Sequence, residues 1–191
     1  MSDPVAEAKF FESYGRAMAK WADFEMNLAH LFAKVTDMHD TVAIRVFFSV
    51  NTSSARLDML GEALPAQAAH PDSVSAIEAV VKRGKQFNST RNALAHEFTW
   101  LRTDYTTMTA EHVLVKTPHL IDIHKRANSL EKAITAAHLF EITENFSKLT
   151  EATARLYGTF EHPELHAQLR AAVLALPTTP YTLSHPNNSS G

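Results

Sequence analysis

The sequence predicts an all-α protein, a helical bundle of four to five helices. Two observations favour this class: apolar residues recur every three or four positions over long segments, and the 191 residues include only five glycines. The chain is long enough for one domain with a sizeable core. We expect that domain to span residues 1–176. Residues 177–191 are expected to form a disordered tail, because their Pro, Ser and Asn content buries little apolar surface.

The first helix is expected to begin at the N-terminus, where Asp3 can cap it and Pro4 suits the first helical position. Its apolar stripe consists of Phe10, Tyr14, Met18, Trp21, Leu28, Phe32 and Val35. Gly15 destabilises a helix by about 1 kcal/mol relative to alanine, which is too little to end one with so much apolar area.

A second helical region begins near Asp40 and resumes after a polar run at residues 51–54. The side chains of that run compete for backbone hydrogen bonds, so we expect a kink or a break there. The segment PAQAAHPDS is a connection, and a third long helix begins around Asp72, with Ser75 and Glu78 at capping-box spacing.

Residues 98–117 are rich in Thr, Tyr, Trp and Val and lack a helical period. They predict either a short β-hairpin or an irregular insertion. The last long helix is expected to begin near Asn128, where Asn128 and Glu131 have capping-box spacing, and a short helix follows at residues 163–176.

The third helix carries an unusual polar stretch, FNSTRNALAHEF, at residues 87–98. Residues four apart share a helix face, so Asn88, Asn92 and His96 point the same way. Arg91 lies beside that face, and its long side chain can reach toward His96.

These residue types offer a specific chemistry. A histidine gives and takes protons near neutral pH, and the fork of an arginine fits a phosphate. Asn92 can orient either ring nitrogen of the histidine or donate to an oxyanion. Together they fit acid–base cleavage of a phosphodiester without a metal. A two-fold dimer would bring two copies of each group into one cleft, and the small Ala93 and Ala95 would allow its close approach.

The hexapeptide RNALAH, residues 91–96, resembles the Arg-x4–6-His motif of the HEPN superfamily, whose members are helical bundles of toxin–antitoxin, phage-defence and RNA-processing systems. WADFEMNLAHLF and FFSVNTSSARLDML resemble the first helices of bacterial members more loosely, so the resemblance covers about residues 10–100 and is expected to include the closing helix. The chain departs from many members in having Glu97, instead of a small residue, after the histidine.

The resemblance implies a homodimer with the motifs at its interface, acting as a metal-independent endoribonuclease that leaves a 2′,3′-cyclic phosphate. Arg91 would then bind the phosphate and stabilise the transition state, His96 would be the acid–base residue, and Asn92 a polar helper. No cofactor is implied. Such an enzyme would serve as a toxin or phage-defence effector, with an antitoxin or other protein as partner. The alternative is a non-catalytic dimeric module that binds RNA or a protein.

Basic residues gather before the motif. No acidic residue occurs from Ala79 to His96, and Lys82, Arg83 and Lys85 lie in that window. With Asn88 they form a candidate RNA track; the alternative is a solvated helix face. The net charge of −3 argues against a protein that coats nucleic acid over its whole surface.

No metal site is expected. His162 and His166 have ligand spacing, but Pro163 should start the helix between them, and His138 is expected to be a hydrogen-bonded core residue. No apolar run approaches the roughly 20 residues that span a bilayer. The N-terminus also lacks the layout of a secretory signal, so a cytoplasmic protein without membrane contact is expected.

Overall fold

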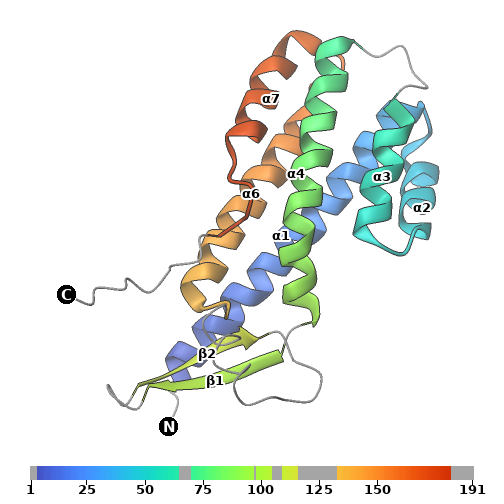
Figure 1. Cartoon of the computed structure of the whole chain (residues 1–191). Coiled ribbons are helices and arrows are strands. Elements are labelled where there is room, and N and C mark those ends of the chain that lie inside the picture. The colour runs from blue at the N-terminus through green and yellow to red at the C-terminus, as the bar shows by residue number, and fades with distance from the viewer. Residues whose placement is uncertain (1–3, 65–69, 97, 105–108, 116–132, 182–191) are drawn as a thin grey trace.

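The predicted all-α bundle with a short β insertion is confirmed by the computed structural model, which describes residues 4–64, 70–96, 98–104, 109–115 and 133–181 (Figure 1). Its α-helices are α1 (Pro4–Thr36), α2 (Asp40–Ser49), α3 (Ser53–Ala63), α4 (Pro71–His96), α6 (Ala136–Gly158) and α7 (His166–Ala175). A 3-10 turn, Pro163–Leu165, leads into α7. No helix in these described ranges is long and apolar enough to cross a membrane.

Aromatic side chains join the three longest helices. Trp21 of α1 lies against Phe146 of α6, with ring centroids 5.1 Å apart, and Phe87 of α4 lies 5.9 Å from the same ring. All three side chains are buried. The apolar residues that recur at helical spacing are therefore buried as predicted, and they form one core between α1, α4 and α6.

The break expected at residues 51–54 is confirmed. Helix α2 ends at Ser49 and α3 begins at Ser53, where the Thr52 side chain accepts a hydrogen bond from the backbone of Ala55. The hydroxyl thus satisfies a backbone donor that the first turn of a helix leaves unpaired.

A partly buried ion pair holds the α2–α3 turn on α1. Arg56 donates to the Glu25 carboxylate over 3.0 Å and to the Val50 carbonyl over 2.9 Å, and Ser53 donates to the same carboxylate. Helices α2 and α3 therefore form a hairpin that covers only the C-terminal half of α1 (Figure 1).

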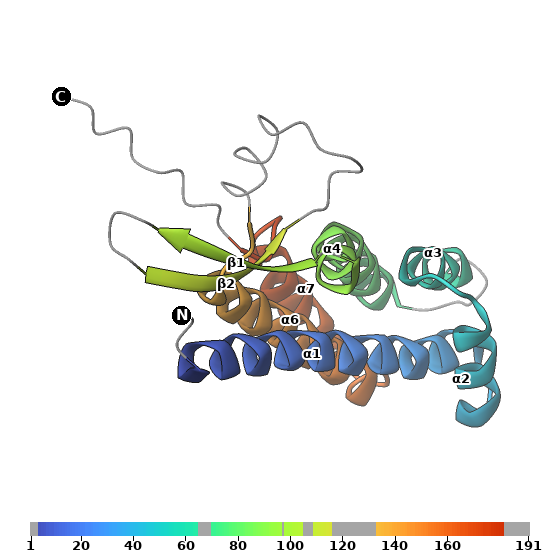
Figure 2. The same cartoon turned by 90° about the horizontal axis from the view of Figure 1, so that it is seen from below.

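The segment after α4 is the β-hairpin, one of its two predicted forms. Strands β1 (Phe98–Asp104) and β2 (Thr109–Val115) are antiparallel, with Phe98 opposite Val115. The hairpin lies across the end of the bundle that holds the start of α1 and the end of α4 (Figure 2). Its His112 packs against Phe10 and Phe11 of α1.

The predicted start of the last long helix was wrong. Residues 133–135 are not helical, because Ile134 exchanges two backbone hydrogen bonds with Leu114 of β2, at 2.9 and 3.0 Å. Helix α6 begins only at Ala136, where Thr135 and His138 form the capping box. Asn128 and Glu131, which carried the prediction, lie outside the described residues.

The expected tail begins later than residue 177. Asn145 of α6 donates to the Pro180 carbonyl over 3.0 Å, and the Tyr181 ring lies 5.1 Å from the His138 ring. Pro180 is buried by these contacts. Residues 177–181 are thus part of the folded domain, and residues 182–191 lie outside the described part of the chain.

Candidate functional site

The motif residues occupy the last turns of α4. Arg91 is half-buried, whereas Asn92 and His96 are exposed. The Arg91 guanidinium donates to the Asn92 amide oxygen over 3.1 Å. Leu94, on another side of the same turn, is buried in the core. The apolar side of α4 therefore anchors the helix and leaves its polar side accessible.

Helix α3 defines which side of α4 the motif occupies. Lys85 forms an ion pair with Asp58 of α3 over 2.6 Å. Asn92 and His96 follow Lys85 by seven and eleven positions, which returns to the same side of a helix. The motif therefore lies on the α3 side of α4, but beyond the stretch that α3 covers (Figure 1).

Helix spacing also places two residues of α1, Met18 and Phe11, on the side of the bundle that faces α3. Glu25 faces α3 through its ion pair with Arg56. Met18 and Phe11 precede Glu25 by seven and fourteen positions, so they share its side of α1. We call the combined area the motif surface: Asn88, Arg91, Asn92 and His96 of α4 with Phe11 and Met18 of α1.

Tyr14 ties the end of α4 to α1. Its hydroxyl donates to the Leu94 carbonyl over 2.9 Å. The last four carbonyls of a helix have no partner within the helix, so this bond satisfies one of them two residues before His96. Sequence reasoning assigned Tyr14 only to the apolar stripe; the signal for its second role is the polar end of a tyrosine inside that stripe.

One residue of the expected RNA track, Arg83, is buried. Arg83 is 6% exposed and donates to the Leu174 carbonyl over 3.1 Å and to the Pro177 carbonyl. Desolvation by burial lowers the pKa of its guanidinium from the usual value. For Arg83, both predictions, an RNA track and a solvated helix face, were therefore wrong. Its side chain joins the end of α7 to α4.

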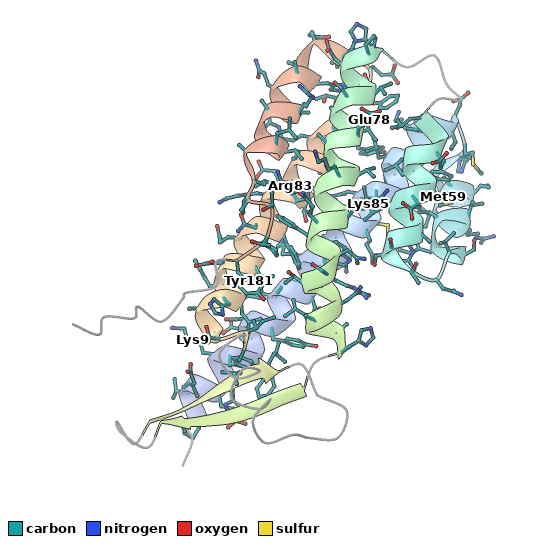
Figure 3. All side chains as sticks on the ribbon, viewed as in Figure 1. Lys9, Met59, Glu78, Arg83, Lys85 and Tyr181 are labelled. Carbon is teal, nitrogen blue, oxygen red and sulfur yellow. The ribbon has the colours of Figure 1, made fainter. Side chains whose placement is uncertain are left out.

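The other members of the track differ among themselves. Lys85 points toward α3, on the opposite side of α4 from Arg83 (Figure 3), and Asp58 neutralises its charge. Lys82 is exposed, and Asn88 is half-buried beside the motif. Helix spacing places Asn88 on the side of α4 that carries Asn92 and His96. Arg83 lies on the opposite side, and Lys85 shares the motif's side but is paired with Asp58.

Of the three histidines considered as metal ligands, His138 and His166 are buried in structural contacts. His166 is fully buried, with Nδ1 2.9 Å from the Ser73 hydroxyl and Nε2 2.9 Å from the Thr159 carbonyl. His162 precedes the 3-10 turn, as Pro163 predicted. His138 is buried and caps α6, which confirms its predicted core role. Among the described residues, no three His, Asp or Glu side chains are arranged to hold a metal.

No protein-family model, curated protein or solved structure matches this chain. The resemblance to HEPN proteins therefore depends on residues 91–96 and on the looser likeness of the first helices. Glu97, the point of departure from that family, lies outside the described residues.

Proposed function

We propose that the chain is a metal-independent endoribonuclease of the HEPN type that acts as a homodimer. The observation that carries the proposal is the accessible cluster of Arg91, Asn92 and His96 at the end of α4. None of the three contributes to the hydrophobic core. These side chains fit phosphodiester cleavage: His96 can transfer a proton, the Arg91 fork can bind a phosphate, and the Asn92 amide can orient its neighbour. All three lie on a helix end that the core anchors.

The reaction follows from these groups. The 2′-oxygen of a ribose attacks the adjacent phosphorus, a bond from phosphorus to the 5′-oxygen breaks, and a 2′,3′-cyclic phosphate forms. His96 of one protomer takes the 2′-hydroxyl proton, and the same residue of the partner protomer gives a proton to the leaving 5′-oxygen. Arg91 stabilises the negative charge that builds on the phosphate oxygens. Asn92 accepts from Arg91 and so orients its fork.

The dimer has support of its own. Within the described part of the chain, Asn88 Oδ1 and Arg91 Nε are shielded from solvent yet lack a hydrogen-bond partner. A buried polar atom without a partner is destabilising, so a small movement of these two side chains toward a second molecule at this surface would be favourable. Ala93 and Ala95 would let that molecule approach closely. We place the two-fold axis near Asn92 and His96.

The biological role follows from the resemblance alone. We propose a toxin or phage-defence effector that acts on RNA in the cytoplasm and is controlled by an antitoxin or other protein. The neighbouring genes test this part of the proposal: an adjacent antitoxin or nucleotidyltransferase would support it, and a purely metabolic operon would count against it.

Three properties of the cleavage test the chemistry in one assay. Purified protein is incubated with mixed single-stranded RNA, and separately with DNA of the same sequences, in EDTA. The proposal requires RNA cleavage despite the chelator, no cleavage of DNA, and products that end in a 2′,3′-cyclic phosphate. Cleavage of DNA, inhibition by EDTA, or 3′-hydroxyl products would contradict it.

One observation favours the alternative, a dimeric module that binds RNA or a protein without cutting. Arg83 donates to backbone carbonyls and Lys85 is paired with Asp58, which leaves Lys82 and Arg91 as the basic side chains of this stretch of α4 that are available to an RNA backbone. Such a module would bind through the motif surface and produce no cleavage across a broad RNA panel.

A further inference from the structure

A partly exposed aromatic side chain, Phe11, lies on the motif surface. Phe11 is 44% exposed, although its neighbour Phe10 is buried. The Phe11 ring lies 5.7 Å from the imidazole of His112 in β2 and 5.5 Å from the Phe10 ring. The two flanking rings hold Phe11 in place, while a large part of its surface remains open to solvent.

The pair of Phe11 and His112 lies close to the motif. Tyr14, one helical turn after Phe11, donates to the Leu94 carbonyl, and Leu94 precedes His96 by two residues. Phe11 also faces the same side of the bundle as Asn92, because both lie on the side that α3 covers further along. A ligand bound at the motif can therefore extend onto Phe11.

The surface between them suits a nucleic acid strand. On this side of α1, the residues at helical spacing after Phe11 are Gly15, Met18 and Ala22, none of which carries a charge. A Cβ added at Gly15 would meet no other part of the described chain within 4 Å, so this position is open. These three positions carry no carboxylate that would repel phosphate, and Glu7, on the same side of α1, lies on the other side of Phe11 from them.

We propose that Phe11 and His112 form a stacking subsite for an unpaired nucleobase of the RNA whose phosphate binds Arg91. This inference rests on the proposed function and makes the substrate class single-stranded RNA. Bases stack on exposed aromatic rings whatever their sequence, because every base has a π face. Paired bases are stacked within their own helix, so double-stranded RNA does not reach this subsite.

Binding measurements on the full-length His96→Ala protein test the subsite without cleavage. The probes are a fluorescein-labelled single-stranded RNA and an abasic ribose-phosphate strand of the same length, followed by fluorescence anisotropy. Phe11→Leu should weaken RNA binding by about 5- to 100-fold, the usual contribution of one stacked base. Phe11→Tyr should restore binding, and binding of the abasic strand should not change between variants.

Phe140→Leu is the matched control, because Phe140 is an exposed phenylalanine of α6, 65% exposed. It should bind RNA as the parent protein does. Equal RNA binding by the Phe11→Leu and Phe140→Leu proteins would overturn the subsite, as would a parent protein that binds both probes alike. A Phe11→Leu protein that becomes monomeric in light scattering would also overturn it and assign Phe11 to a protein interface.

Cleavage distinguishes this failure from failure of the proposed function. A wild-type enzyme that cleaves RNA in EDTA, with no effect of Phe11→Leu on kcat/KM, would retain the nuclease and reject the subsite. Binding of RNA that depends on Phe11, in a wild-type protein that never cleaves, would retain the subsite and reject the nuclease.

Discussion

Replacing Gly84 by alanine tests how closely α4, which carries the motif, is packed against its neighbours. A Cβ at this position would lie 2.9 Å from Leu57 Cδ2 of α3 and 3.0 Å from Phe24 Cζ of α1. Both neighbours are completely buried, so they have little space into which to move. Gly15 of α1 is the matched control, since a Cβ there would meet nothing within 4 Å.

The two substitutions should change the free energy of unfolding differently: Gly15→Ala should raise it, and Gly84→Ala should not. Alanine stabilises a helix interior by about 0.5–1 kcal/mol relative to glycine, and Gly15→Ala should gain this amount in full. Gly84→Ala has the same gain, but overpacking of a rigid core is destabilising by about 1–3 kcal/mol. We therefore expect Gly84→Ala to be between neutral and about 2.5 kcal/mol less stable than wild type.

Urea unfolding followed by circular dichroism measures the difference. All proteins should be compared at one concentration, because dimerisation makes apparent stability depend on concentration. For a chain of this size, each 1 kcal/mol corresponds to about 2–4 °C in melting temperature, which gives an independent check. A Gly84→Ala protein as stable as Gly15→Ala would refute the close packing of α3, α4 and α1 described above.

Three further predictions concern the motif helix, the C-terminus and the assembly. Tyr14→Phe keeps the ring but removes the hydrogen bond to the Leu94 carbonyl; it should lower stability by about 0.5–1.5 kcal/mol in urea unfolding and slow RNA cleavage, and unchanged cleavage would contradict a positioning role. Deletion of residues 177–191 should lower the melting temperature more than deletion of residues 182–191, because only the longer deletion removes the contacts of Pro180 and Tyr181. Light scattering at micromolar concentration should give the mass of a dimer, and a monomer would refute the proposed assembly.

The helices could be predicted where their signals are local. The apolar period of α1 depends on residues three or four positions apart. The break between α2 and α3 is equally local, because the Thr52 hydroxyl caps α3 by accepting from the backbone of Ala55. The start of α6 could not be predicted in this way. Ile134 pairs with Leu114 of β2, and this bridge keeps residues 133–135 out of the helix.

The candidate site shows the same division. Asn88, Asn92 and His96 share a side of α4 because helix geometry alone decides it. The burial of Arg83 depends on carbonyls 91 and 94 positions away in sequence, and no local pattern announces them. Tyr14 likewise acts on a carbonyl 80 positions away. Sequence reasoning therefore finds the motif, but the contacts that hold it come from the fold.

The rate of RNA cleavage by the wild-type and His96→Ala proteins tests the central claim most directly. His162→Ala is the matched control, because this histidine is also exposed, with 64% of its side chain accessible, and lies at the other end of the bundle, near the start of α7. Under single-turnover conditions in EDTA, loss of His96 should reduce the rate by about 10² to 10⁴-fold, the usual contribution of a positioned acid or base. His162→Ala should cleave at the wild-type rate. Equal rates for the wild-type and His96→Ala proteins, both folded and dimeric, would contradict the account.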